Sequence, residues 1–129
     1  MSPVEHFEDL IAWQKARTLR VEVYEMARGA KVRREFDFTS QIKRAAVSIM
    51  SNIAEGFERG GRAEFAQFLC TAKASCAEVR SLLYVALDEG YIDQPTFARL
   101  AAQAQEVGRI VGGLRAAVAR QGDEARAKH

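Results

Sequence analysis

One row of polar side chains has a spacing that could support chemistry, because its members recur every three or four residues between Ala, Val and Ile. At about 100° per residue, such steps fall on one line along a helix. The row consists of Gln41, Arg44, Ser48, Asn52 and Glu55. Its candidate partners further along the chain are Ser75 and Glu78, which lie one helical turn apart.

A catalytic role for this row would require an activated nucleophile. Ser48 has no His or Lys one turn away to act as its base. His6 and His129 lie near the termini, with no carboxylate or Cys set around them that would make a triad or a metal site. Gly-rich phosphate loops and His-x-x-x-His or Glu-x-x-His pairs are also missing from the sequence. We therefore expect no enzyme activity, no metal and no cofactor.

The alternative interpretation of the row is a structural hydrogen-bond network, and the sequence favours it. Buried polar groups must be satisfied, so such a network fixes one helix register and one assembly. Arg44 is expected to face a carboxylate, either Glu78 or the Glu55 of another subunit, in a charge-assisted pair. Cys70 and Cys76 stand about 240° apart around a helix, so they are expected to be buried free thiols and not a disulfide.

Four long helices are expected to position these groups. Both prolines of the chain, at positions 3 and 95, lie outside the expected helix interiors. The helices are expected at about residues 10–28, 39–57, 62–89 and 94–119. Short connections make neighbouring helices antiparallel. The sequence therefore predicts an all-α single domain over residues 1–120, an antiparallel up-down-up-down four-helix bundle, followed by a frayed or disordered tail at 121–129.

Apolar spacing and terminal residues support these helices. The third helix alternates steps of three and four through Phe65, Phe68, Ala72, Ser75, Val79, Leu82 and Ala86. The fourth repeats the pattern, and its small residues, among them Gly108 and Gly112, would allow a neighbouring helix to come close. The predicted N-caps are Asp9, Thr39 and Asp93, and the predicted C-terminal glycines are Gly29 and Gly90.

The first helix carries a second apolar stripe that a monomeric bundle does not need. It comprises Leu10, Trp13, Val21 and Tyr24, interleaved with Arg17, Arg20 and Arg28. Trp, Tyr and Arg are enriched at subunit interfaces. Aromatic faces also stack on bases, and guanidiniums bind phosphates. The interface is the favoured interpretation, because soluble proteins seldom leave such a patch uncovered.

The overall charge is only faintly basic, with 19 Lys and Arg against 17 Asp and Glu. This excess does not by itself indicate a nucleic-acid-binding protein. The remaining cations cluster in two loops expected at opposite ends of the bundle: Lys31, Arg33 and Arg34 in the first, and Arg59 and Arg62 in the second. They are either solvated loop charges or, multiplied in a ring of subunits, a continuous basic rim.

The localisation expected from the sequence is cytoplasmic. The N-terminus shows no secretory signal pattern. The longest apolar run, 45–54, is about half of the ~20 residues that a membrane span needs. We therefore expect no membrane association.

Three segments of the chain resemble a known family. FEDLIAWQKA, EFDFTSQIKRAAVSIMSNIAEGFERG and EFAQFLCTAKASCAEVRSLLYVALDEGYI are similar to the bacterial family encoded in intervening sequences of 23S ribosomal RNA genes, the S23 ribosomal protein family. The likeness spans roughly residues 7–118. Where the family usually has Pro in its SI-P-SNIAEG segment this chain has Met50, so the second helix is expected to be straighter.

The resemblance implies a left-handed bundle that assembles into a homopentameric ring, related to the accessory protein of diversity-generating retroelements. That relative works beside a reverse transcriptase and binds nucleic acid. By this likeness the partners would be further copies of the chain, RNA or DNA, and a reverse-transcriptase-like or other protein.

Two functional hypotheses follow. The first is a non-enzymatic, homo-oligomeric module that binds structured RNA or DNA through Arg17, Arg20, Lys31, Arg33, Arg34, Arg59 and Arg62. The second is a structural or protein-interaction scaffold without nucleic-acid binding, in which Trp13, Val21 and Tyr24 form the oligomer interface.

Overall fold

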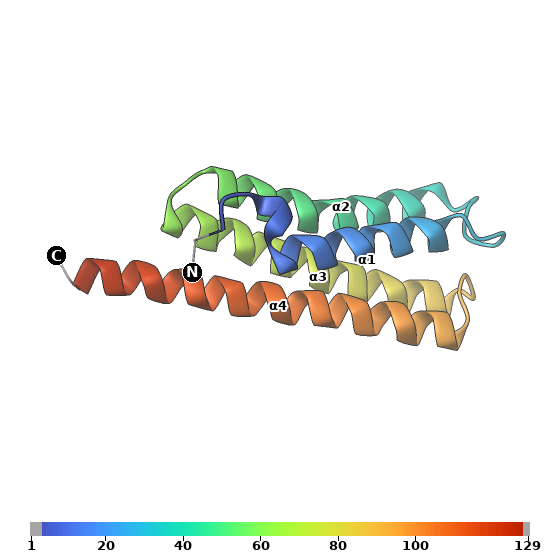
Figure 1. The fold of residues 1–129 in the computed structure, drawn as a ribbon. Helices are drawn as coiled ribbons and strands as arrows, with labels where there is room; N and C mark the ends of the chain where they lie inside the picture. The colour runs from blue at the N-terminus through green and yellow to red at the C-terminus, as the bar shows by residue number, and fades with distance from the viewer. Residues whose placement is uncertain (1–3, 128–129) are drawn as a thin grey trace.

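The computed structural model describes residues 4–127, and its regular structure in that range is entirely helical. A single turn of 3-10 helix, η1 (Phe7–Asp9), precedes four long helices. These are α1 (Ile11–Ala27), α2 (Phe36–Glu58), α3 (Arg62–Asp88) and α4 (Gln94–Ala127). Figure 1 shows them running alternately up and down, side by side.

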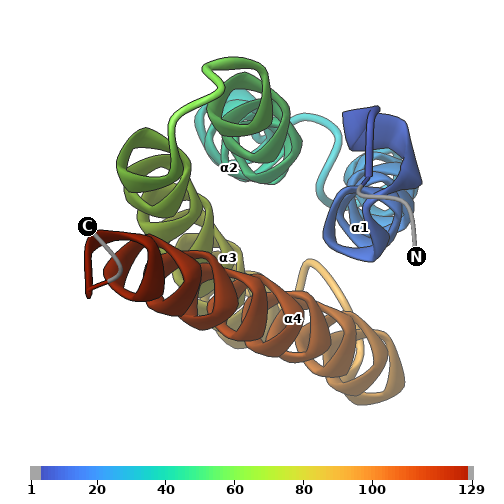
Figure 2. The ribbon, with the colours of Figure 1, turned by 60° about the vertical axis from the view of Figure 1, so that its left-hand side comes forward.

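The helices are arranged in a ring in which each contacts its two neighbours. Contacts join α1 to α2, α2 to α3, α3 to α4 and α4 back to α1, while no Cα atoms of the diagonal pairs lie within 8 Å of one another in the described range. Figure 2 shows the same arrangement viewed nearer the bundle axis. The predicted all-α, antiparallel four-helix bundle is therefore confirmed.

The core is built from the apolar faces that the three-four spacing indicated. Fully buried side chains come from all four helices: Leu19, Val23, Ile42, Ile49, Ile53, Leu69, Val79, Leu83, Leu100 and Val111. The α2 helix passes through Met50 without interruption, as expected for a residue that keeps its backbone N–H.

Two predicted N-caps are wrong. Asp9 lies inside η1, and Leu10 instead adopts the extended conformation before α1. The α2 helix begins at Phe36, three residues earlier than expected, so Thr39 lies inside it. The Thr39 hydroxyl donates to the Phe36 carbonyl (3.2 Å), so its hydrogen bond is made within the helix and does not cap the helix N-terminus. Both errors arose because a short extra turn uses the residues that look like caps.

Gly90 and Asp93 behave as expected, whereas Gly29 follows the C-cap Arg28 without the positive φ of a C-terminal glycine. Gly90 takes a positive φ of 72°, and the Tyr91 N–H donates to the Ala86 carbonyl (2.8 Å), which closes α3 with a Schellman motif. Asp93 Oδ1 accepts the Thr96 N–H (2.9 Å) at the start of α4. Hydrogen bonds from the Thr96 side chain and backbone lower the pKa of the Asp93 carboxyl below its usual value.

The α4 helix is longer than the 94–119 expected from the sequence. Its helical backbone continues to Ala127, through most of the segment expected to be frayed, and residues 128–129 lie outside the described range. The added turns contain Ala, Arg and Glu, which are good helix formers, and no proline. This end of α4 projects past the other helices (Figure 1).

Candidate functional site

Two members of the polar row, Ser48 and Asn52, form a hydrogen-bond network with their predicted partner Ser75 between α2 and α3. The Ser48 and Ser75 hydroxyl oxygens lie 2.8 Å apart and share a hydrogen bond. Asn52 Nδ2 donates to the Ser48 carbonyl (2.8 Å) and to Ser48 Oγ (3.0 Å). Ser75 is buried and the other two are half-buried, so the network lies at the edge of the core. The hydrogen bond between Ser48 and Ser75 therefore links α2 to α3.

The remaining members of the row lie outside this network. Gln41, Arg44, Glu55 and Glu78 are all exposed. The Arg44 guanidinium donates to Ser40 Oγ (2.9 Å), and no ion pair between Arg44 and Glu78 forms among the described residues. That part of the sequence expectation is corrected for the single chain: in water, Arg44 finds a partner one turn away on its own helix.

A shallow groove nevertheless connects the exposed Arg44 and Glu78 to Ser48 of the hydrogen-bond network. It measures about 190 Å³ and is lined by Gln41, Arg44, Ala45, Ser48 and Glu78. A cation and a carboxylate thus share one rim, next to the serine pair. The lining of the groove offers neither a His nor a Lys that could activate Ser48.

A double-mutant cycle tests the serine pair as a structural contact. Replacing Ser48 or Ser75 by alanine leaves one hydroxyl facing an apolar surface, and each change is expected to cost about 1 kcal/mol of unfolding free energy. The double variant is expected to cost less than the sum of the singles, with a coupling of at least about 0.5 kcal/mol in urea denaturation. Strict additivity would show that the 2.8 Å contact contributes nothing.

The outer face of α1 joins aromatic rings to cations. The Arg17 guanidinium lies 5.7 Å from the Trp13 ring centroid, and Arg20 lies 4.9 Å from that of Tyr24. Lys43 reaches Tyr24 from α2, at 5.1 Å. Distances of this order are typical of cation–π contacts. We call this surface, made by Trp13, Arg17, Arg20, Val21 and Tyr24, the α1 face.

The α1 face is partly open to solvent. Val21 is 50% exposed, and neighbouring Ile11 is 63% exposed. A groove of about 610 Å³ runs along Glu8, Trp13, Gln14, Arg17, Thr18 and Val21. One predicted member of the stripe is misplaced, because Leu10 is only 9% exposed and belongs to the core. It turns inward because it links η1 to α1 instead of lying within α1.

The two basic loops lie at opposite ends of the bundle, roughly 35 Å apart by the length of α2. Lys31, Arg33 and Arg34 in the loop between α1 and α2 are exposed. At the other end, Arg59 lies 5.3 Å from the Phe68 ring centroid and 3.9 Å from a Glu64 carboxylate oxygen. Arg62 is hydrogen-bonded to Gln121. The first loop follows the C-terminal end of α1 in the chain, and the second is a separate cluster held by local contacts.

The sequence interpretation missed a third basic surface, between α3 and α4. A groove of about 650 Å³ is lined there by Lys73, Arg80 and Arg109, over a floor rich in Ala and Gly. The spacing of Gly108 and Gly112 was the available signal, but it was interpreted as a place for close helix packing. Cys70 is exposed at this groove, contrary to expectation, whereas Cys76 is buried as expected.

The described residues include neither a metal-binding cluster nor a membrane-spanning helix. Over the described residues, no group of three or more His, Cys, Asp or Glu side chains is arranged to hold a metal ion. The helices of the described range also include none that is long and apolar enough to cross a membrane.

Comparison with known proteins identifies relatives. The sequence model of the 23S rRNA-intervening sequence protein family matches residues 8–113. A solved structure from Bacteroides thetaiotaomicron VPI-5482, described as a protein with unknown function from the S23 ribosomal protein family, has a TM-score of 0.74 at 21% sequence identity. The alignment covers 81% of this chain and 98% of that one.

A search of curated proteins finds no match. At 21% identity the solved structure supports the fold alone, whereas the family model spans most of the bundle, from η1 into α4. The chain therefore belongs to the 23S rRNA-intervening sequence protein family.

Proposed function

We propose that this protein is a non-enzymatic, homo-oligomeric bundle that binds structured RNA or DNA through the α1 face and the loop between α1 and α2. The observation that carries the proposal is that guanidiniums lie beside aromatic rings on the α1 face and that an exposed basic loop follows the end of α1. Such a surface offers stacking for bases and positive charge for phosphates.

The placement of the cations favours this surface over the loop between α2 and α3. Lys31, Arg33 and Arg34 are exposed in the loop that follows α1. Arg59 and Arg62 already contact Glu64 and Gln121, and they lie roughly 35 Å away by the length of α2. A ligand that touches both loops of one chain must therefore be long, or must bridge chains. In a homopentamer, the assembly that the family resemblance implies, each loop would be repeated around a ring.

Fluorescence anisotropy of labelled structured RNA, duplex DNA and single-stranded DNA tests the proposal. Binding is expected at low salt, to persist near physiological salt, and to prefer one of the three. A Lys31→Gln/Arg33→Gln/Arg34→Gln variant is expected to bind more weakly and to show a shallower salt dependence, by about two to three log units of affinity per log unit of salt. No binding of any of the three at low salt would rule the proposal out.

The second candidate function is a protein-interaction scaffold, and the open apolar surface on α1 favours it. Ile11 and Val21 are both at least half exposed, beside the half-buried Trp13. Solvent-facing apolar side chains next to Trp and Arg are typical of an interface core. A subunit that covered this surface would exclude nucleic acid from it, so the two functions compete for the α1 face.

Val21→Glu is expected to lower the oligomer mass measured by light scattering, because a carboxylate would be desolvated if the α1 face is covered by another subunit. Val21 is a cleaner probe than Trp13, which also packs against Phe7 and the core. The matched control is Val85→Glu, at an α3 valine that is 43% exposed. Equal masses for wild type and both variants would place the interface elsewhere.

A further inference from the structure

We propose that the groove between α3 and α4 binds a phosphodiester backbone and is a second nucleic-acid contact surface, separate from the α1 face. The groove is lined by three cationic side chains, Lys73, Arg80 and Arg109, and by no carboxylate. This inference rests on the proposed function, to which it adds a binding site and the chemical group recognised there.

The three cations are not engaged elsewhere in the described part of the chain. The ion pairs found there use Lys15, Arg28, Arg59 and Arg99. Lys73, Arg80 and Arg109 take part in none of them, and all three are exposed. Their charge is therefore available to a ligand without breaking an internal contact.

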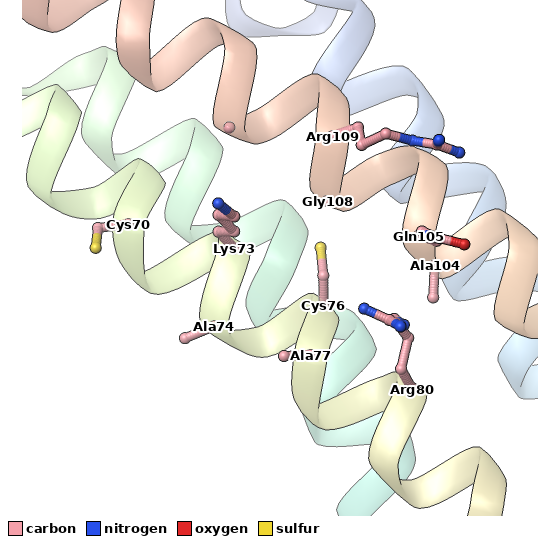
Figure 3. A pocket seen from close by; sticks show the side chains of 11 residues that line it. Cys70, Lys73, Ala74, Cys76, Ala77, Arg80, Ala104, Gln105, Gly108 and Arg109 are labelled. Carbon is pink, nitrogen blue, oxygen red and sulfur yellow. The ribbon is translucent and has the colours of Figure 1, made fainter.

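The shape of the groove brings a ligand close to both helices. Figure 3 shows Lys73, Cys76 and Arg80 rising from α3 toward α4, whereas the Arg109 side chain extends from α4 away from α3. The Lys73 side chain reaches across to Gly112, where an added Cβ would meet its Nζ at 3.5 Å. Ala104, Gly108 and the nearly buried Cys76 lie at the base of the groove, and the exposed Ala74 and Ala77 line its α3 edge. No large side chain fills the space above that base.

The spacing of the cations fits a polyanion better than a single small anion. Lys73 and Arg80 are seven residues apart on α3, which is about 10 Å along the axis. One nucleic-acid strand carries a phosphate about every 3.4 Å of duplex axis. The cations are therefore spaced to contact separate phosphates along a strand, and they do not converge on one.

An acidic helix from a partner protein would also meet positive charge here, but the floor does not suit it. A docked amphipathic helix is held by large apolar anchors inserted in hydrophobic pockets. The uncharged lining consists of alanine, glycine, the two cysteines and Gln105. A surface of cations over small residues is instead expected to bind with low sequence specificity and strong salt dependence.

The groove lies on the far side of the bundle from the α1 face. The α1 helix contacts α2 and α4, whereas no Cα atoms of α1 and α3 lie within 8 Å of one another in the described range, and Figure 2 shows α3 diagonally across from it. Variants of the two surfaces can therefore be tested separately.

The experiment compares two triple variants that remove equal charge. The groove variant is Lys73→Gln/Arg80→Gln/Arg109→Gln. The matched control is Lys15→Gln/Arg59→Gln/Arg99→Gln, in which each original cation is ion-paired and none belongs to the α1 face or to the loop between α1 and α2. Thermal unfolding establishes that both are folded, and anisotropy with the three labelled nucleic acids is measured over a series of salt concentrations.

The groove variant is expected to bind at least tenfold more weakly than the control near 0.1 M salt, with a salt slope lower by about 2. A second pair of variants adds charge instead of removing it. Ala77→Glu places a carboxylate on the α3 edge of the groove and is expected to weaken binding at least threefold relative to Ala102→Glu, an exposed α4 site outside the groove.

The outcomes separate this inference from the proposed function. If the wild type binds and the groove and control variants are indistinguishable, the groove is not a contact surface, while the proposed function stands. If no nucleic acid binds the wild type even at low salt, both fail. A labelled poly-glutamate peptide is titrated in parallel. If only its binding depends on the groove cations, the groove takes an acidic protein segment and the proposal is overturned.

Discussion

Gly56→Ala is expected to destabilise the bundle, although alanine is the better helix former. An ideal Cβ at position 56 would lie 2.5 Å from Phe68 Cβ and 3.1 Å from Phe65 Cδ1. Phe68 Cβ is attached directly to the α3 backbone, so relief requires the two helices to move apart. Overpacking of this kind costs about 1–3 kcal/mol, or a fall in Tm of roughly 4–12 °C for a chain of this size.

Gly113→Ala is the matched control for this prediction. Gly113 lies in the interior of α4, is exposed, and has no atom within 4 Å of an added Cβ. The change is expected to raise stability by up to about 1 kcal/mol through helix propensity alone. Urea denaturation of the three proteins measures both effects. A Gly56→Ala variant as stable as Gly113→Ala would show that α2 and α3 are not held in this close approach.

Gly56 also shows why sequence patterns predicted the fold better than its details. The three-four apolar spacing in α3 and α4 depends only on which side of a helix each residue occupies, and it correctly indicated Val79, Ala86, Val107 and Val111 as core residues. A close approach depends on how two distant segments meet. Nothing local to Gly56 distinguishes it from a glycine that ends a helix.

The hydrogen-bond network of the candidate site was predictable from the sequence, whereas the basic groove was not, because the groove depends on how two distant segments meet. The link from Ser48 to Asn52 is local, at four residues, and the Ser75 contact followed because a serine occupied a core position of α3. The basic groove between α3 and α4 was not foreseen, because its cations come from two helices whose relative register the sequence does not show. Lys73 and Gly112 are neighbours only in the folded bundle.

The thiol of Cys76 is expected to react with a disulfide reagent such as DTNB at least a thousandfold more slowly than that of Cys70. Cys76 is 2% exposed, and burial raises its pKa from 9.0 to about 12. Because the thiolate is the nucleophile, at pH 8 a pKa of about 12 leaves only about one molecule in ten thousand reactive. Steric exclusion slows the reaction further, whereas Cys70 is exposed.

Single-cysteine variants measure the two rates separately. Cys70→Ser reports on Cys76, and Cys76→Ala reports on Cys70. In denaturant the two thiols are expected to react at similar rates, which would show that the difference belongs to the fold. Native rates within tenfold of one another would contradict the buried placement of Cys76.

The raised pKa of Cys76 also predicts the direction of a pH effect on stability. The folded protein keeps the Cys76 proton up to a pH of about 12, whereas the unfolded chain releases it near 9. The unfolded state therefore binds fewer protons in this interval, so stability is fully present below pH 9 and falls as the pH rises toward 12. At pH 10 the loss is about 1 kcal/mol relative to pH 8.

Comparing Cys76→Ala with wild type isolates this loss from the titration of lysines and tyrosines, which the two proteins share. Alanine leaves a small cavity beside Gly108, whose added Cβ would lie 3.6 Å from that of Cys76, so the variant starts out less stable. The stability gap between the two proteins is expected to narrow from pH 8 to pH 10, because only wild type loses a proton from this position on unfolding. A constant gap would mean that the thiol ionises equally well in the folded bundle, and therefore that water or a cation in the basic groove reaches it.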